Sequence, residues 1–398
     1  MFLTVTGALA GDMPRDVLRR SAIIGLIAFL TLIDLFGSQA LLPRLVDLYQ
    51  TDAATMGFAV NASTIGMALA GITVAWFSDR IDRRRGLWLS LAILAIPTFL
   101  LSITRDPTIF AVLRIAQGAC MATAFTLTMT YLSERCDLTA AAGAMAAYIT
   151  GNVAANLFGR LMAGAFADWV GVPGSFVAFA CLNLIGAAVA YLYISPDMPH
   201  GPRPGESPLM AWRAHLSVPA LRAAFGVGFL ILFAFIGTFT YVNLELVGPR
   251  LGLDAAYLGV VYLVFAPALL TTPLAGRAVA RWGPRPVYWA AAVISILGLV
   301  LLLVPSLPPV LLGLALMGAG TFFAQAAATG FVGRRAVSHH AAANGLYLTS
   351  YYMGGLLGAL VLGQIYVRSG WPATVGLLIA AMALSCLLAR RFDTPPPE

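Results

Sequence analysis

The chain has 398 residues, of which 60% are hydrophobic and 10% are charged, and its formal net charge is +7. A soluble domain of this length needs far more charged side chains to cover its surface, so the composition excludes a soluble globular protein and predicts a polytopic membrane protein. All of the basic residues are arginine, and the positive net charge does not indicate nucleic-acid binding, so we expect no nucleic-acid partner.

Twelve apolar runs in the sequence are long enough to cross a bilayer, which takes about 20 residues in a helix. They lie near residues 21–43, 57–78, 86–104, 107–130, 139–163, 172–194, 220–246, 254–277, 285–304, 308–332, 340–365 and 371–391. Because the bilayer core has no water to bond the backbone, these runs are predicted to be helices. The predicted fold class is an all-α polytopic membrane protein with twelve transmembrane helices.

A proline-rich stretch separates the first six runs from the last six. Residues 195–219 contain six prolines, with charged residues and histidines between them, and this density of proline does not allow a continuous helix. We interpret the stretch as a cytoplasmic linker, with a short segment around Trp212 lying on the membrane surface. The predicted organisation is an N-terminal six-helix bundle over residues 1–194, the linker over 195–219 and a C-terminal six-helix bundle over 220–398.

The arginines are distributed unevenly between the two sides of this topology. Eighteen fall on the side of the termini and the linker, whereas only Arg44, Arg105, Arg250 and Arg368 fall in loops on the other side. Because positively charged loops resist translocation, the asymmetry predicts a multi-pass protein of the inner (plasma) membrane with both termini in the cytoplasm.

A short arginine-rich loop joins the second and third runs, and a similar loop returns about 200 residues later. The first, residues 75–85, reads AWFSDRIDRRR, and the second, residues 276–285, reads GRAVARWGPR. Both resemble the cytoplasmic loop signature of the major facilitator superfamily, G-x-x-x-D-R-x-G-R-R, although Ala280 stands where the second copy would carry the acid. The resemblance implies a gating loop that contains Asp79, Arg80, Arg84, Arg281 and Arg285.

This resemblance covers nearly the whole chain, and parallel motifs such as Gly118-Ala119 and Gly318-Ala319 recur in the two halves. It implies two pseudo-symmetric six-helix bundles related about the membrane normal, with a transport site between them near the midplane. It also implies alternating access, in which the two halves rock about that site.

Asp34 lies midway along the first run, and Thr31 and Ser38 share its helical face. A charged residue inside a span costs roughly 2.5–3.5 kcal/mol on insertion scales, so we expect this polar stripe to face a water-filled cavity and not lipid. Because burial favours the neutral form of a carboxyl group, Asp34 could take up and release a proton during transport. The alternative is a permanently hydrogen-bonded structural residue.

Arg114 and Gln117 lie in the fourth run, in the sequence Leu113–Gly118 that reads LRIAQG. The segment resembles the R-x-x-Q-G motif in the fourth helix of the twelve-helix drug/proton antiporters, near the arabinose-efflux permease-like proteins of bacteria. The resemblance implies that Arg114 faces the cavity and supports proton coupling, and the alternative is an interhelical strut.

Glu245 ends the seventh run, with Thr238 and Tyr241 on the same helical face. We keep two interpretations of it. It is either a second acidic site for proton coupling, or a residue that reaches the periplasmic interface and has no part in coupling.

Four polar residues follow one another at four-residue steps in the fifth run: Tyr148, Asn152, Asn156 and Arg160. Residues at this spacing lie along one helical face. The run also resembles the antiporter signature of the fifth helix, G-x8-G-x3-G-P-x2-G-G, at Gly151 and Gly159, but Asn156 and Arg160 stand where the signature has proline and glycine. We interpret the glycines as close-packing positions, and antiport as a hypothesis.

Polar and aromatic residues from both halves are predicted to line the substrate cavity. They are Thr31, Ser38, Gln39, Gln117, Tyr148, Asn152, Asn156, Tyr241, Gln325 and Tyr351. Such side chains along one cavity suit an amphipathic organic molecule, and also a sugar or a metabolite.

The sequence contains no P-loop, no metal-binding cluster and no nucleophile–base pair. We therefore expect no enzyme activity, no cofactor and no metal. The predicted function is secondary active transport, the proton-coupled efflux of a small organic compound by alternating access. The alternative is an uptake symporter or uniporter of a sugar or metabolite on the same fold. The expected partners are the small-molecule substrate, protons and the lipid bilayer, and the expected state is a monomer.

Overall fold

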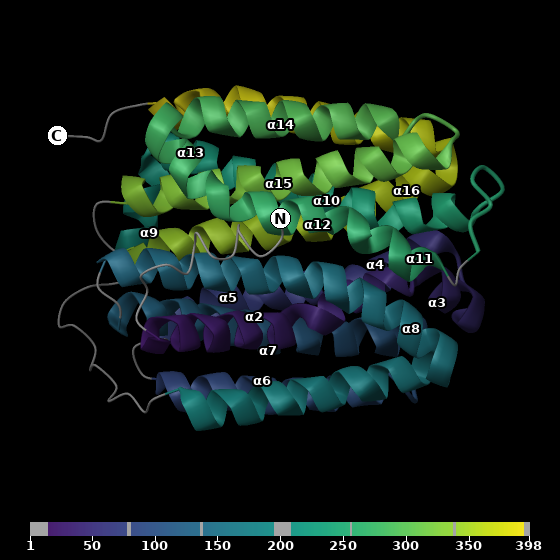
Figure 1. Cartoon of the computed structure of the whole chain (residues 1–398), viewed down its shortest axis with the longest axis horizontal. Coiled ribbons are helices and arrows are strands. Elements are labelled where there is room, and N and C mark those ends of the chain that lie inside the picture. The colour runs from purple at the N-terminus through teal and green to yellow at the C-terminus, as the bar shows by residue number, and fades with distance from the viewer. Residues whose placement is uncertain are drawn as a thin grey trace.

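The structure is a computed structural model, and it describes residues 15–77, 81–135, 138–194, 208–254, 257–336 and 340–393. Almost all of these residues are helical, and the long helices run side by side between two opposite ends of the molecule (Figure 1). We call the end at which α9 (Pro208–Ser217) and α13 (Ala275–Trp282) lie the linker end. The opposite end, at which α3 (Leu42–Tyr49) lies, is the α3 end.

The helices fall into a first and a second half along the chain. The first half contains α2 (Arg15–Ala40), α3, α4 (Ala53–Asn61), α5 (Ser63–Phe77), α6 (Arg83–Leu100), α7 (Pro107–Arg135) and α8 (Leu138–Tyr193). After α9, the second half contains α10 (Pro219–Val247), α11 (Leu258–Val261), η3 (Tyr262–Phe265), α12 (Ala266–Thr271), η4 (Thr272–Leu274), α13, α14 (Pro284–Leu301), α15 (Leu307–Arg335), α16 (His340–Leu388) and η5 (Ala389–Asp393).

Two of these helices, α8 and α16, each combine two of the predicted spans. They contain Gly171 and Gly370, both with φ of 74°, and in each helix a proline follows two residues later. Glycine adopts this left-handed conformation without the steric cost that a Cβ would add. The chain folds back at Gly171, so that Phe166 before it and Phe179 after it lie with ring centroids 5.9 Å apart.

Eight helical stretches of the described chain are long and apolar enough to cross a membrane. Since α8 and α16 each contain two spans, and since α6 and the segment from α11 to α13 supply two more, the structure accounts for the twelve predicted spans.

The structure differs from the predicted elements in three places. The predicted helix 254–277 is broken into the short pieces α11 to α13, because Pro267 and Pro273 lack the backbone donors that a continuous helix needs. The second predicted helix divides at Ala62, between α4 and α5. The proline-rich linker contains the ten-residue helix α9, which begins at Pro208, where the first turn of a helix tolerates proline.

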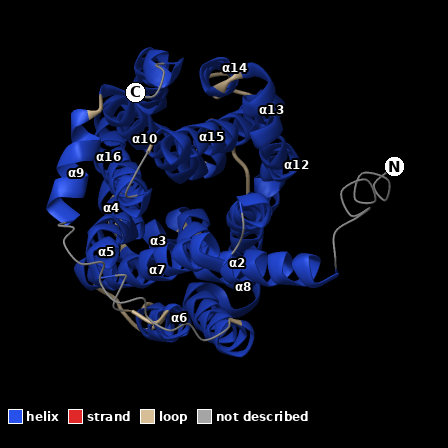
Figure 2. Ribbon diagram, turned by 90° about the vertical axis from the view of Figure 1, so that its left-hand side faces the viewer, coloured by secondary structure: helices blue, strands red, loops and turns tan. Residues whose placement is uncertain are grey.

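The two halves pack in equivalent ways. In the first half α2 packs against α8, and in the second α10 packs against α16. The halves meet where α4 and α5 lie against α16, and where α8 lies against α11 and η3. Figure 2 shows the two bundles end on, one above the other. The protein is therefore an all-α membrane protein of two pseudo-symmetric helical bundles, as the sequence predicts.

Candidate transport site

Asp34 of α2 is completely buried, with an exposed fraction of 0%. Its Oδ2 accepts hydrogen bonds from the Gln117 amide at 3.0 Å and from the Thr98 hydroxyl at 3.2 Å. The Oε1 of Gln117 in turn accepts a bond from Arg114 Nη1 at 2.7 Å. One amide group therefore connects the guanidinium of Arg114 to the carboxyl group of Asp34. We call Asp34, Thr98, Arg114 and Gln117 the first-half cluster.

Arg114 also binds the point at which α4 gives way to α5. Its Nε donates to the Val60 carbonyl at 2.8 Å, and its Nη2 donates to the Ser63 hydroxyl at 3.2 Å. Gly118 makes this reach possible, because a Cβ at that position would lie 1.8 Å from the Ser63 carbonyl oxygen. The glycine of the R-x-x-Q-G motif thus allows α7 to approach α5 closely.

The polar stripe of α2 lies inside the first bundle in this conformation. Thr31 and Ser38 are buried and donate hydrogen bonds to carbonyls of their own helix, those of Ile27 and Asp34. Side chains of α6 and α7 enclose the carboxyl group of Asp34, which differs from the predicted placement of the stripe on a water-filled cavity. The Oδ1 atom of Asp34 is buried and has no hydrogen-bond partner among the described residues.

A second buried polar cluster joins the two halves, nearer the α3 end. Gln39 of α2 donates from its amide to the Asn61 side-chain oxygen at 2.8 Å, and Asn61 donates to the Thr240 hydroxyl of α10 at 3.1 Å. Asn243 of α10 donates to the Gln39 backbone carbonyl at 3.0 Å. These bonds hold α2 and α4 of the first half against α10 of the second.

Arg160 of α8 completes this arrangement, and it is fully buried. Its Nε donates to the Asn156 side-chain oxygen at 3.0 Å, its Nη1 donates to the Phe239 carbonyl at 3.2 Å, and its Nη2 donates to Gln39 Oε1. Tyr262 of η3 lies with its ring 4.4 Å from the guanidinium carbon, and its hydroxyl donates to Asn243. We call Gln39, Asn61, Asn156, Arg160, Thr240, Asn243 and Tyr262 the inter-half cluster.

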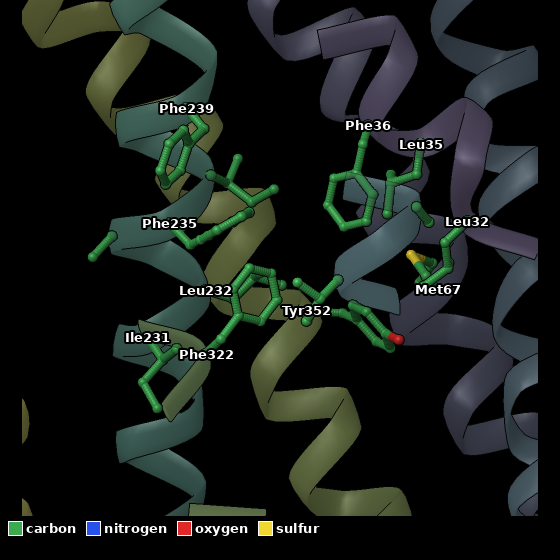
Figure 3. Packing of buried hydrophobic residues seen from close by; sticks show 14 of the residues in the cluster. Leu32, Leu35, Phe36, Met67, Ile231, Leu232, Phe235, Phe239, Phe322 and Tyr352 are labelled. Carbon is green, nitrogen blue, oxygen red and sulfur yellow. The ribbon is translucent and has the colours of Figure 1, made fainter. Parts of the chain in front are cut away.

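Aromatic side chains fill the boundary between the halves beside this cluster. Phe36 of α2 faces Phe235 and Phe239 of α10 (Figure 3), and the Phe36 and Phe235 rings lie 6.4 Å apart in an edge-to-face arrangement. These rings therefore cover one part of the inter-half cluster, beside Arg160.

The polar row of the fifth predicted helix continues from Arg160 toward the linker end. Asn156 and Tyr148 are fully buried, and Asn152 is partly buried. The Nδ2 of Asn156, the Oδ1 of Asn152 and the hydroxyl of Tyr148 are all buried without a hydrogen-bond partner among the described residues. Buried polar atoms are normally paired, so unpaired atoms along one helical face point to a ligand or water path.

The remaining predicted cavity residues lie in the second half. The Tyr241 hydroxyl donates to the Ala359 carbonyl at 2.6 Å and lies beside Gly57 and Gly363, so this side chain joins α10 to α4 and α16. Gln325 and Tyr351 are partly buried, and Tyr351 stacks on Tyr347. The roles of these residues in a cavity stay predictions.

Glu245 lies at the α3 end of α10, and its described side-chain contacts are with residues outside both clusters. Its Oε1 accepts a bond from the Tyr366 hydroxyl at 2.9 Å, and its Oε2 lies 3.4 Å from the guanidinium of Arg250. The carboxylate is therefore paired near the end of the helix. Of the two interpretations of Glu245, this position favours the interfacial one, and a part in coupling stays a prediction.

Of the gating-loop residues, the structure describes Arg84, Arg281 and Arg285. Asp79 and Arg80 lie outside the described residues. Arg84 donates to the Tyr191 carbonyl near the end of α8, and its guanidinium lies 4.6 Å from the Tyr191 ring. Arg281 and Arg285 lie over the rings of Trp282 and Trp289. The two contacts between Arg84 and Tyr191 therefore bind the start of α6 to the last turns of α8, within the first half.

Sequence reasoning missed four members of the inter-half cluster and one of the first-half cluster. They are Asn61, Thr240, Asn243, Tyr262 and Thr98. The two asparagines carry a signal that could have been used, because an amide inside an apolar run needs a partner. Nothing in the sequence pairs Asn61 with a residue of α10, since the two lie 179 residues apart.

The helical bundles and their buried polar clusters define a multi-pass membrane transporter. The sequence profile of the Major Facilitator Superfamily matches residues 24–267 and 246–398, and the chain belongs to this family. It is a transporter and not an enzyme.

Relatives and solved structures agree with this assignment. The chain is 28% identical to the inner membrane transport protein YnfM of Escherichia coli (strain K12), over 89% of this chain and 85% of that protein. It is 29% identical to the MFS-type transporter YybF of Bacillus subtilis (strain 168), over 71% and 72% of the two chains.

Two solved structures share the fold. A bacterial homologue of the human lysosomal transporter Spinster, in an inward-facing and unoccupied conformation, matches with a TM-score of 0.73 and 17% identity, over 97% of this chain and 100% of that one. A point mutant of the nucleoside transporter NupG matches with a TM-score of 0.69 and 18% identity, over 94% and 98% of the chains.

Proposed function

We propose that the protein is a proton-coupled secondary active transporter that exports a small organic compound by alternating access. The observation that carries this proposal is the environment of Asp34. The carboxyl group is buried, neutral donors bind its Oδ2, and no described residue bonds its Oδ1. A proton that binds Oδ1 therefore displaces no existing hydrogen bond, so the group can be protonated and deprotonated in place.

Arg114 supplies the charge that makes both protonation states accessible. When Asp34 is ionised, the guanidinium stabilises the carboxylate through the Gln117 amide. When Asp34 is protonated, this attraction falls, and Arg114 keeps its bonds to Val60 and Ser63. The protonation state of Asp34 thus changes how strongly α2 is held to α7.

This change reaches the boundary between the halves by a short path. Arg114 binds the junction of α4 and α5, and both of these helices pack against α16 of the second half. A shift at this junction therefore alters the inter-half contact. Such coupling is reciprocal, so that substrate binding between the halves must change the proton affinity of Asp34 by the same factor.

Alternating access requires the inter-half cluster to come apart. Asn61–Thr240, Asn243–Gln39 and Arg160–Phe239 are hydrogen bonds across the boundary, and they must break before the α3 end can open. In the proposed cycle, substrate enters from the linker end while these bonds are closed and leaves at the α3 end after they open.

The proposed orientation places the linker end and both termini in the cytoplasm. The arginine asymmetry supports this orientation. The similarity to an inner membrane transport protein of Escherichia coli supports only the choice of membrane. The two bundles, residues 1–194 and 220–398, would then move as units of a monomer, and the gating loop with Asp79 and Arg80 would restrain them on the cytoplasmic side. A reporter that works only in the cytoplasm should be active when it is fused at residue 205. Activity at that position of a reporter that works only in the periplasm would contradict the orientation.

The function can be tested with purified protein in liposomes that contain a pH-sensitive dye. Under an imposed proton gradient, addition of compounds from a panel of organic cations, anions and neutral molecules should release protons for at least one compound. Asp34→Asn should remove this release. Asp47→Asn is the matched control, because Asp47 is an exposed acid on α3. The direction in which the compound moves separates export from the alternative, uptake. Compound flux without any proton movement in the wild type would contradict the proposal.

A further inference from the structure

We propose that Arg160 is an anion-binding residue, and that the substrates of this transporter are amphipathic organic anions whose carboxylate binds to it. This inference rests on the proposed transport function and names its substrate class. It starts from the buried positive charge of Arg160, which lies outside the first-half cluster that contains Asp34.

Arg160 is a buried cation without an acidic partner among the described residues. Its partners are the side-chain oxygens of Asn156 and Gln39 and the backbone carbonyl of Phe239, all of which are neutral. The ion pairs found in the described part of the chain join Arg44 to Asp168 and Arg250 to Glu245, near the α3 end. A buried guanidinium is normally paired with an anion, so this one retains the capacity to bind a carboxylate.

The surroundings of Arg160 fit an anion that also carries an apolar group. Four rings surround the guanidinium carbon within 5.8 Å, those of Phe36, Phe239, Tyr262 and Phe265. Asn156 adds a second donor, because its Nδ2 is buried and has no partner among the residues described. A carboxylate at this place could accept bonds from the guanidinium fork and from the Asn156 amide, with its apolar body against the rings.

The sequence of the fifth predicted helix supports a role particular to this chain. Asn156 and Arg160 stand where the antiporter signature has proline and glycine, so the signature's own packing does not require either side chain. Asn152 and Tyr148 continue the polar face toward the linker end, and each has a buried polar atom without a described partner. These groups provide hydrogen-bonding positions along which a polar head group can approach Arg160.

Anion binding at Arg160 would also act on the boundary between the halves. The carboxylate would replace neutral acceptors, among them the Phe239 carbonyl, which belongs to α10 of the opposite half. Losing that hydrogen bond weakens the contact that holds the α3 end closed. The substrate would thus favour the opening through which it leaves.

The test is equilibrium binding to the purified full-length protein at fixed pH, without a gradient. Three carboxylates are compared with their neutral amides: benzoate with benzamide, 2-naphthoate with 2-naphthamide, and 4-phenylbutyrate with 4-phenylbutyramide. Isothermal titration should show at least one carboxylate binding tenfold or more tightly than its amide. Absence of this preference in all three pairs would overturn the proposal.

Two variants assign the preference to Arg160. Arg160→Gln should lower the affinity for the carboxylate at least tenfold and leave the affinity for its amide within threefold. Asn156→Asp should have the same effect without removing the guanidinium, because it places a carboxylate where the Asn156 oxygen lies 3.0 Å from Arg160 Nε. This second variant decides the matter if Arg160→Gln does not fold. Wild-type carboxylate affinity in the folded variants would overturn the proposal.

Asp34→Asn separates this inference from the proposed function. It should remove proton release in liposomes, and the purified variant should still bind the carboxylate tenfold or more tightly than its amide. If proton release depends on Asp34 but no carboxylate is preferred, only the anion site is wrong. If carboxylates bind through Arg160 and move without protons, only the coupling is wrong.

Discussion

The first-half cluster and the inter-half cluster each contain a fully buried arginine, but they balance its charge differently. Arg114 is connected through Gln117 to the carboxyl group of Asp34, whereas Arg160 contacts neutral oxygens and aromatic rings. A buried charge is costly unless a partner compensates it. The first-half cluster therefore contains both the cation and the acid that balances it, whereas the inter-half cluster contains a cation and no acid.

The two clusters also differ in what they connect. The described bonds of Arg114 run to Val60, Ser63 and Gln117, all in the first half, whereas Arg160 also binds the Phe239 carbonyl in the second. The first-half cluster can thus change its protonation without separation of the halves. The inter-half cluster loses hydrogen bonds when the halves separate. This difference suggests a division of tasks between proton coupling and the opening of the α3 end.

The largest expected effect is the loss of uphill transport in Asp34→Asn. This change removes the acid of the first-half cluster and leaves the inter-half cluster as it is. Accumulation against a gradient should fall to background, at least tenfold. Exchange of labelled for unlabelled substrate across liposomes at equal pH should stay within about threefold of the wild type, because it needs no proton step. The measurement is the ratio of these two fluxes. If Asp34→Asn still accumulates substrate with unchanged pH dependence, Asp34 is structural and Glu245 becomes the next candidate.

A disulfide between the halves should prevent the inter-half cluster from separating and leave the first-half cluster unchanged. A Cβ built at Gly164 lies 3.2 Å from the Gly259 Cα, close enough for a Gly164→Cys/Gly259→Cys pair to be oxidised. In a background without the four native cysteines, oxidation should lower substrate flux at least tenfold, and reductant should restore it. Gly164→Cys alone is the control. Wild-type flux with the disulfide formed would show that α8 and α11 need not separate.

Gly118→Ala should disturb the first cluster through packing. The added Cβ would lie 1.8 Å from the Ser63 carbonyl oxygen, so α5 and α7 must move apart. Overpacking of this kind typically costs about 1–3 kcal/mol of stability. Gly276→Ala is the matched control, since nothing lies within 4 Å of its added Cβ, and at a helical position it should be neutral or stabilising by about 0.4–1 kcal/mol. Thermal unfolding in detergent measures both, and equal melting temperatures would contradict the close approach.

The smallest effect is expected for Glu245→Gln, which lies outside both clusters. The Glu245–Arg250 pair has side-chain exposures of 14% and 25%, and such pairs near the surface contribute about 0–1 kcal/mol. The glutamine keeps an oxygen for the Tyr366 hydroxyl, so stability and flux should change little, with flux within about twofold. A loss of substrate-driven proton release in this variant would instead make Glu245 a coupling residue.

The sequence predicts those residues of the candidate site whose type is unusual for their position. Asp34, Arg114 and Gln117 stand out because charged and amide groups are rare inside apolar runs, and the structure brings these three together. The sequence does not show that Asp34 points toward α6 and α7, because a helix of polar and small residues on several faces can be rotated in more than one way. Arg160 was visible as a member of the row on the fifth predicted helix, but its aromatic surroundings were not.

The sequence by itself determined the twelve spans, the proline-rich linker and the repeat of the two halves, because the length of an apolar run and the presence of proline are local properties. Only the tertiary structure decided which polar groups meet. Arg160 and Gln39 lie 121 residues apart, and Asn243 and Gln39 lie 204 residues apart. Their hydrogen bonds depend on how far each helix is rotated and how closely it approaches its neighbours, and small residues at the helix contacts allow the close approach.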